Sequence, residues 1–317
     1  MRLTVTTFNL ENLFNRYAFL DMPWEERNYE KIVQAVGLVS VASRKGDLVS
    51  YQTTEIQRNN TARALLDSEP DVLAVQEVEN LYTLRLFNEE YLDNYFDRML
   101  LIDGNDPRGI DVGFLVRRGF AGRIRNVRTH VDEAVPGAAI ARSSVRNFGY
   151  LVHGALFSRD CLEVDLELGN RVITFLVNHF KAQDGTQDAV RRRKRQASRV
   201  AELAVEAVQE GRLPVVLGDL NAPPDADGSL DALLNSPVLQ DPFPKDTWTH
   251  YYVPAKRISR LDYILPHKKL KVEDVNIVRK GLTTKCKQYQ GERYPTVGPA
   301  HTEASDHCPV SVRLKVG

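Results

Sequence analysis

The sequence predicts an α/β protein whose buried strands carry polar residues at their ends. Residues 214–217 form an unbroken apolar run that leads through a glycine into Asp219 and then Asn221. Residues 71–80 repeat this pattern, with Glu77 at the end of the apolar run and an asparagine shortly after it. Short apolar runs bounded by turn residues are typical of buried central strands. Because the two strands lie far apart in the chain, we expect a pseudo-duplicated architecture with both carboxylates at one rim.

The carboxylate of Asp219 needs a compensating partner at the mouth of such a strand. Side chains alternate along a strand, so Asp219 and Asn221 share one face. An ionised carboxylate is costly in apolar surroundings unless a metal ion, a cationic side chain or a substrate offsets its charge. The alternative is that Asp219 caps a turn formed by residues 221–225, which are rich in turn residues.

Composition limits the classes of protein that the chain can represent. Its 317 residues suffice for one large domain or two small ones. Lysine plus arginine and aspartate plus glutamate number 42 each, so a site for a polyanion must be local. Three widely spaced cysteines argue against a disulfide framework and against a paired-cysteine zinc site. Because neither a signal peptide nor a membrane-spanning run is visible, we expect a cytoplasmic protein, and no obligate protein partner is evident.

The first third of the chain alternates predicted strands and helices. The N-terminal residues predict a strand that ends at Asn9 and Glu11, which share one face unless they cap the following turn. Residues 21–60 are expected to form a helical insertion or a loop. Residues 57–66 predict a helix that ends before a proline. Residues 81–98 have apolar side chains at three- and four-residue spacing, which predicts a further helix.

Polar residues in the middle of the chain leave alternatives open. Asp111 lies in an otherwise apolar strand, where it could pair with an arginine or face the site. Arg142 and Arg146 belong to a loop that could contact phosphates or could simply be solvated. Residues 123–135 predict a further strand, and residues 161–168 alternate strictly, which predicts a half-buried outer strand.

Further polar residues follow predicted strands in the second half of the chain. The apolar residues 171–177 lead into Asn178 and His179. A histidine in this position can hydrogen-bond phosphate oxygens or transfer a proton, although a lone histidine is more often structural. Asp262 lies among apolar residues, and the pair at 306–307, an aspartate and a histidine, directly precedes the last strand.

A basic helix is the one dense positive patch in the sequence. Residues 188–210 have the apolar spacing of a helix, and its first turns carry the basic run 191–195. Arg192 and Arg195 are therefore candidates for contacts with a polyanion. The alternative is an ordinary solvated helix face.

The polar residues at strand ends form an oxygen-rich set with only two histidines. Such ligands suit a hard cation, Mg²⁺ with Mn²⁺ or Ca²⁺ as alternatives, better than zinc. The sequence has no P-loop, dinucleotide loop or G-x-S-x-G motif. Metal-assisted attack of water on a phosphoester is the reaction class that fits. The set comprises Asn9, Glu11, Glu77, Asn178, His179, Asp219, Asn221, Asp262, Asp306 and His307.

Six short motifs carry a resemblance to a known family. In chain order they are Thr-Phe-Asn-Leu-Glu-Asn-Leu-Phe (7–14), Val-Gln-Glu-Val-Glu-Asn (75–80), Asn-His-Phe-Lys (178–181), Gly-Asp-Leu-Asn (218–221), Arg-Leu-Asp-Tyr-Ile-Leu (260–265) and Ser-Asp-His-Cys-Pro-Val (305–310). Together they resemble the endonuclease/exonuclease/phosphatase superfamily, the DNase I-like metal-dependent phosphohydrolases. The motifs follow the order of that family and cover nearly the whole chain, so the set is far more specific than any single motif.

The resemblance implies a four-layer α/β sandwich of DNase I type. Two mixed β-sheets would pack face to face with helices outside. Residues 1–317 would form a single domain of two pseudo-symmetric halves, about 1–155 and 156–317. The site would lie at one rim, between the two halves.

The resemblance also implies the metal ligands. Glu77 would be the principal ligand, with Asn9 close to it. Glu11 would contact the metal directly or through a ligand, and Asp306 would help to bind it. Asp111 occupies a position that varies within the superfamily.

The same resemblance implies the catalytic residues. Asp219 would position or deprotonate the attacking water, and Asn221 would hold the phosphate. Asp262 would orient His307. His307 and His179 would stabilise the charge that develops on the phosphoryl oxygens.

Two kinds of substrate are consistent with the resemblance, which is strongest to the bacterial nuclease-type branch. The first is DNA, cleaved by an endonuclease of little sequence specificity. Arg142, Arg146, Arg192 and Arg195 would then hold its backbone, and Asn178 and Asp111 would also bind the substrate. The second is a small-molecule or lipid phosphoester, which the balanced net charge favours. A non-catalytic binding module would not need so many costly carboxylates.

Overall fold

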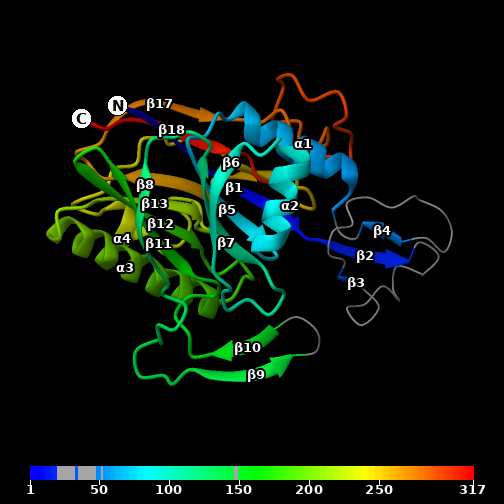
Figure 1. The fold of residues 1–317 in the computed structure, drawn as a ribbon. Coiled ribbons are helices and arrows are strands. Elements are labelled where there is room, and N and C mark those ends of the chain that lie inside the picture. Colours follow the sequence, from blue (N-terminus) through cyan, green and yellow to red (C-terminus); the bar gives the residue numbers. More distant parts are fainter. Residues whose placement is uncertain (20–32, 35–47, 51–52, 146–148) are drawn as a thin grey trace.

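Two mixed β-sheets pack face to face, and helices cover their outer sides, which gives four layers (Figure 1). This arrangement confirms the α/β sandwich expected from the sequence. The two chain ends lie together, since the amino group of Met1 donates to Val316 O at 2.8 Å. The computed structural model describes residues 1–19, 33–34, 48–50, 53–145 and 149–317.

The first sheet combines the N-terminal third of the chain with its last two strands. Strands β1 and β5 run parallel, and the other neighbouring pairs run antiparallel. In order across the sheet the strands are β17 (Lys271–Ile277), β18 (Val310–Lys315), β1 (Arg2–Leu13), β5 (Val72–Val78), β7 (Asp111–Arg117) and β6 (Phe96–Leu101).

The second sheet is built from the middle of the chain. Strands β12 and β13 run parallel, and the remaining neighbours run antiparallel. In order the strands are β16 (Asp262–Pro266), β13 (Leu213–Asp219), β12 (Arg171–His179), β11 (Cys161–Leu168) and β8 (Arg123–Arg128). Sheet membership does not follow a boundary near residue 155, because β8 precedes it while β17 and β18 return to the first sheet. The division into two pseudo-symmetric halves stays a prediction.

The main hydrophobic core lies between the two sheets. Strand alternation sends Val5 and Phe114 of the first sheet toward Val164 and Phe175 of the second, and all four side chains are fully buried. The rings of Phe114 and Phe175 lie 5.1 Å apart between centroids. Fully burying side chains of this size stabilises the fold by about 1.5–3 kcal/mol each. The core therefore fixes the position of one sheet relative to the other, and with it the edge of the sandwich where strand ends from both sheets meet.

Helices cover the outer face of each sheet. Helices α1 (Glu55–Asp67) and α2 (Leu81–Tyr91) pack on the first sheet, and α3 (Gln187–Gln209) and α4 (Asp231–Leu234) pack on the second (Figure 1). Thr54 starts α1 with a capping box, and Thr186 caps α3. Asn80, which follows Glu77 in the repeated sequence pattern, caps α2: Thr83 N donates to its Oδ1 at 2.8 Å.

Two predicted elements need correction. The helix expected over 81–98 ends at Tyr91, because Asp93 and Asn94 adopt left-handed φ angles of 48° and 53°, and β6 follows. The outer, half-buried strand expected over 161–168 is β11, which is buried along nearly its whole length and lies inside the sheet. Ion pairs made by Glu163 and Asp165, described below, satisfy the charges on its polar face.

Buried charges on β11 are neutralised by two arginines. Arg128 Nη1 lies 2.7 Å from Glu163 Oε1 and 3.0 Å from Asp165 Oδ2. Arg212 Nη1 makes equivalent pairs at 2.7 and 3.0 Å. Alternating polar residues therefore do not make β11 a half-buried strand, because carboxylates that are paired and hydrogen-bonded can be buried.

Three small sheets accompany the two large ones in the described residues. Part of the region 21–60 lies outside the described residues, as does Arg146. In the described residues, no helix has an apolar stretch long enough to cross a membrane. The strands of the small sheets are β2 (Arg16–Phe19), β3 (Val33–Gln34) and β4 (Leu48–Ser50), then β9 (Ala141–Val145) and β10 (Gly149–His153), then β14 (His250–Tyr252) and β15 (Arg257–Ser259).

Candidate active site

The predicted strand-end residues converge at one rim of the sandwich. Parallel pairing of β1 with β5 and of β12 with β13 brings the carboxyl ends of these strands to the same side of each sheet. Asp262 begins the antiparallel β16 directly opposite Asp219. His307 lies just before β18, in a β-bridge with His250. The fold therefore collects side chains from far apart in the chain within one buried cluster.

Irregular backbone aims the side chains at this rim. Glu77 has a φ of 62° and lies at a register shift between β5 and β7, which is a bulge. Glu11 and Asn12 have φ angles of 48° and 62° at a register shift between β1 and β5. Asn12 N donates to Glu77 Oε2 at 3.1 Å, which ties the two irregular segments together.

Gly218 allows the close approach of β13 to β12 just before Asp219. Its φ is 130°, and a Cβ added there would lie 1.9 Å from Asn178 O. No other residue fits this position without moving the backbone. The glycine in the Gly-Asp-Leu-Asn motif is therefore a packing requirement that sets the position of the aspartate after it.

Asp219 is the hub of the cluster and is 1% exposed. Asn9 Nδ2 donates to its Oδ2 at 3.1 Å, and Asn221 N donates to its Oδ1 at 2.9 Å. Burial raises the pKa of Asp219 to about 7; His307 opposes this shift and Asp262 adds to it. The Asn221 amide also donates to Phe180 O at 3.1 Å and to Asp219 Oδ2 at 3.3 Å, so Asn221 fixes the carboxylate as well as the turn.

His307 is held by a fully buried carboxylate. Its Nδ1 lies 2.9 Å from Asp262 Oδ2, and its Nε2 lies 3.8 Å from Asp219 Oδ2. Thr249 Oγ1 donates to Asp262 Oδ2 at 2.6 Å and so fixes the carboxylate in turn. Burial alone would lower the pKa of His307, but the charges of Asp262, Asp219 and Asp306 raise it well above its usual value.

His179 lies between two carboxylates of the cluster. Its Nε2 is 3.8 Å from Glu77 Oε1 and 3.5 Å from Asp219 Oδ2. Burial and the positive charge of Arg159 hold the pKa of His179 well below its usual value, so the ring is neutral. Among the described residues, its buried Nδ1 has no hydrogen-bond partner.

The carboxylates at the rim fit a divalent cation. Burial, followed by the charges of Asp306, Glu303 and Glu77, raises the pKa of Glu11 well above its usual value. Asp306 N donates to Glu11 Oε2 at 2.8 Å, so the backbone offsets only part of this repulsion. Crowded carboxylates with amide oxygens nearby form the donor set that hard cations prefer. A cation would relieve the repulsion that the pKa of Glu11 records.

Several other predicted residues do not join the cluster. Asn178 lies on the opposite face of β12 from His179, and its Nδ2 donates to Leu176 O at 2.8 Å. Asp111 accepts a hydrogen bond from Gly104 N at 2.7 Å, and burial with nearby carboxylates raises its pKa to about 7. The described hydrogen bond of Asp111 is therefore to a backbone amide, and its role in binding substrate stays a prediction.

The described arginine candidates divide into one half-buried side chain, Arg192, and two exposed ones. Arg192 donates to the carbonyls of Ala155, Leu156 and Phe157 at 2.9, 3.4 and 3.5 Å, so it anchors α3 to this segment. Arg195 is exposed on the same helix. Arg142 is exposed and pairs with Asp132.

Residues that the sequence did not single out support the cluster. Ser305 Oγ donates to Asn9 O at 2.8 Å and accepts from His307 N at 3.0 Å, joining β1 to the His307 segment. Arg159 is 3% exposed; it donates to Phe180 O at 3.0 Å and pairs with Asp106 at 3.0 Å. Of these two residues, only Ser305 could have been found from the sequence, because it directly precedes the Asp306-His307 pair.

Comparisons with known proteins agree with the fold described above. A model of the Endonuclease/Exonuclease/phosphatase family matches residues 36–307. An endonuclease/exonuclease/phosphatase from Bacteroides vulgatus has a TM-score of 0.59 at 14% identity, covering 100% of both chains. A humanized D. rerio TDP2 has a TM-score of 0.59 at 13% identity, covering 99% of both chains.

A third solved structure is a mannosyl-6-phosphatase, Bt3783 of Bacteroides thetaiotaomicron. It has a TM-score of 0.58 at 16% identity, covering 99% of this chain and 100% of that one. At such identities the likeness concerns the fold alone. No curated protein sequence matches the chain.

Proposed function

The chain belongs to the endonuclease/exonuclease/phosphatase family, and from this premise we propose that it is a metal-dependent phosphodiesterase that cleaves DNA with little sequence specificity. One observation carries the proposal. Asp219 and His307 lie together at a buried rim, and a group of acidic residues that suits a hard cation lies beside them. Such a site supplies a base, a hydrogen-bond donor and a metal site for attack of water on a phosphoester.

The acidic residues of the rim would hold the cation. Glu77 and Glu11 offer carboxylate oxygens, with Asn9 and Asp306 beside them. A bound Mg²⁺, or Mn²⁺ or Ca²⁺ in its place, would supply positive charge that offsets the negative charge developing on the phosphoryl oxygens. The bulge at Glu77 supports this role because it turns the side chain away from the regular strand alternation.

Asp219 would accept the proton of the attacking water. Its two carboxylate oxygens already receive hydrogen bonds from Asn9 and Asn221, which hold the group in one orientation. Burial makes Asp219 more basic than an exposed aspartate, which suits a general base near neutral pH.

The two histidines would act on the phosphoryl group. Asp262 holds His307 Nδ1, so the opposite nitrogen of that ring points toward the cluster and can donate a hydrogen bond. His179, kept neutral by burial, can donate from Nε2 without adding a second full charge. Donors fixed in a buried site stabilise developing charge more strongly than water does.

Exposed cations support a nucleic acid as the substrate. Arg191, Lys194 and Arg195 are exposed in the first turns of α3, whose N-terminus follows β12 and His179 after a short loop. Contacts of this kind bind phosphates without reading bases, which accounts for the proposed lack of sequence specificity. The cytoplasmic location expected from the sequence stays a prediction.

Nicking of supercoiled plasmid tests the proposal. Purified protein should nick plasmid with Mg²⁺ or Mn²⁺, and EDTA should abolish the reaction. Asp219→Asn, which keeps the shape of the side chain and removes its charge, should lose the activity. Metal-dependent nicking that persists in this variant would show that Asp219 is not the base or that a contaminant is responsible.

A small-molecule or lipid phosphoester is the second candidate substrate. Arg192, a predicted backbone contact, is used inside the fold to bind carbonyls, which removes one cation from the proposed DNA surface. A small chromogenic phosphodiester and a sugar phosphate should be assayed beside the plasmid. Metal-dependent hydrolysis of either one without nicking would favour this candidate over DNA.

A further inference from the structure

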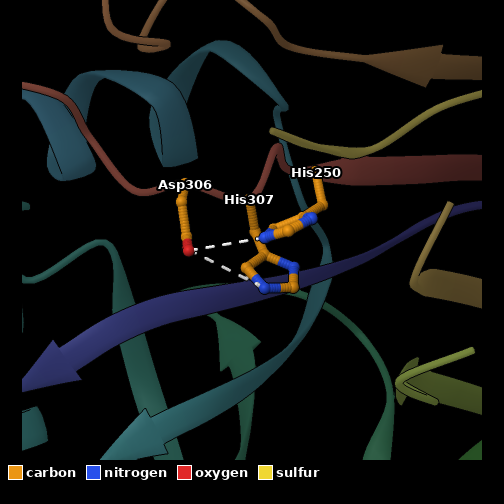
Figure 2. A group of neighbouring side chains, drawn as sticks. All are labelled: His250, Asp306 and His307. Atoms are coloured by element: carbon orange, nitrogen blue, oxygen red, sulfur yellow. Dashed lines mark ion pairs between the residues drawn. The ribbon is translucent and has the colours of Figure 1, made fainter. Parts of the chain in front are cut away.

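Two histidines and an aspartate converge beside the site described above. His250 lies at the start of β14, and Asp306 and His307 lie just before β18. Figure 2 shows the carboxylate of Asp306 facing both imidazole rings. Asp306 Oδ2 lies 3.5 Å from His250 Nε2, and Asp306 Oδ1 lies 3.8 Å from His307 Nε2. One ligand atom from each residue lies within 4.8 Å of the other two.

We propose that His250, Asp306 and His307 form a second divalent-cation site, of zinc-type chemistry. Two imidazoles and one carboxylate, with a fourth position left for water or substrate, are a usual ligand set for Zn²⁺ in open sites. Tetrahedral coordination with bonds of about 2.0–2.1 Å separates two ligand atoms by about 3.4 Å. The nearest approaches, 3.5 Å to Asp306 Oδ2 and 3.8 Å to Asp306 Oδ1, involve different oxygens and are longer than a hydrogen bond, and one ligand atom per residue lies within 4.8 Å of the others, so small side-chain movements would complete the site.

In each ring, the Nδ1 atom, which would not bind the cation, has a hydrogen-bonding partner of the kind that metal-binding histidines require. His307 Nδ1 lies 2.9 Å from Asp262 Oδ2, and His250 Nδ1 lies 3.0 Å from Ser259 Oγ. When Nδ1 donates its proton to such a partner, Nε2 keeps the lone pair that binds a metal. A cation that displaces the Nε2 proton would therefore meet a lone pair from each ring beside the same carboxylate.

Burial and charge also favour a cation in this position. His250 and His307 are 8% and 7% exposed, whereas the Asp306 side chain is 34% exposed and leaves a route from solvent. The Asp306 carboxylate lies within 4 Å of both rings, so it can share a cation with them. The rings lie 4.6 Å apart between centroids, so His250 is already in place.

A cation in this site would change what His307 can do. Its Nε2 cannot bind a metal and donate a hydrogen bond to a phosphoryl oxygen at the same time. A zinc-type ion should therefore inhibit hydrolysis that Mg²⁺ supports at the acidic side of the rim. This consequence rests on the proposed function, whereas the existence of the site does not.

Cobalt binding tests the site without any substrate. Co²⁺ replaces Zn²⁺ in nitrogen-containing sites, and four-coordinate Co²⁺ absorbs visible light strongly. With Mg²⁺ in excess, the protein should bind one equivalent of Co²⁺ with this absorption, and added Zn²⁺ should abolish it. His250→Phe keeps an aromatic ring between His307 and Tyr252 and removes the ligand nitrogen, so it should weaken Co²⁺ binding at least tenfold.

A surface histidine gives the matched control. His301→Phe removes an exposed imidazole outside the cluster and should leave the Co²⁺ spectrum and affinity unchanged. Equal binding by wild-type protein and His250→Phe, or no four-coordinate spectrum in the wild type, would overturn the proposal. If His250→Phe does not fold, Ser259→Ala decides: it leaves all three ligands in place and should weaken binding about 10- to 100-fold. Unchanged binding in that variant would count against the site.

Activity then separates this inference from the proposed function. If the chain hydrolyses phosphodiesters, Zn²⁺ should inhibit the wild type more strongly than His250→Phe. A protein that binds Co²⁺ as expected but hydrolyses nothing would retain the second site and lose the proposed function. A protein that nicks DNA but lacks the absorption of four-coordinate Co²⁺ would retain the proposed function and lose the second site.

Discussion

Replacing Asp262 by asparagine tests whether a buried carboxylate controls His307. The substitution preserves shape, and the side chain is fully buried, so solvent cannot replace the lost charge. Opposite unit charges about 3 Å apart attract by roughly 5 kcal/mol at an effective dielectric constant of about 20. Losing this attraction would lower the pKa of His307. Asparagine can also turn its NH₂ toward Nδ1, which would favour the wrong tautomer.

We expect Asp262→Asn to reduce kcat on a small phosphodiester by about 10²- to 10⁴-fold with little change in KM. The histidine pKa, followed by NMR, should fall in the variant, which a purely structural role would not produce. Thr249→Val is the matched control, because it removes the 2.6 Å hydrogen bond to Asp262 and keeps the charge. It should cost much less activity. Activity within threefold of wild type for Asp262→Asn, with an unchanged histidine pKa, would refute this reasoning.

Three further perturbations have distinct expected outcomes. Glu77→Gln removes a charged ligand, so the Mg²⁺ concentration for half-maximal activity should rise at least tenfold; an unchanged metal titration would contradict the assignment. Arg195→Gln should weaken DNA binding and reduce its salt dependence by about one ion, whereas Arg192→Gln should lower stability by about 1–3 kcal/mol, because it leaves carbonyls unpaired. Equal effects of the two arginine variants in both assays would contradict this division. Although burial alone would lower the pKa of His130, its hydrogen bonds to Glu163 and Glu133 raise it. The protonated His130 therefore stabilises the folded protein fully below the unfolded pKa of about 6.5, and this contribution is lost as pH rises through the folded pKa. In thermal melts, the loss of stability caused by His130→Gln should be largest in acid and should shrink in base.

The strand ends were predictable because the same local rule applies to each of them. A buried strand that ends in a carboxylate or an amide is visible in sequence, and parallel pairing then brings such ends together. Asn9 and Glu77 reach the rim on β1 and β5, and Asp219 and His179 reach it on β13 and β12. Because the sandwich brings these strand ends to one buried rim, several motifs that are weak one by one together predict a single site.

Partners that depend on the approach of distant segments were not predictable. His250 and Thr249 come from a short hairpin whose place is fixed by a β-bridge to His307 and by a hydrogen bond to Asp262. The contacts of Arg192 were not predictable because a basic run has no local sign of the carbonyls that it meets. Long polar side chains take their role from what packs against them, and this information is not local.

Backbone strain gives evidence for the rim that is independent of the motifs. Asn12 and Asn221 adopt left-handed φ angles of 62° and 53°, which asparagine tolerates in turns. Glu11 and Glu77 adopt φ angles of 48° and 62°, where glutamate is disfavoured by about 1–3 kcal/mol. A glycine at either position would relieve this strain, so the glutamates are explained better by what their carboxylates do than by the backbone. Because hydrogen bonds from Asn12 N and Asp306 N hold both carboxylates in place, the strain falls on the two residues that the metal proposal requires.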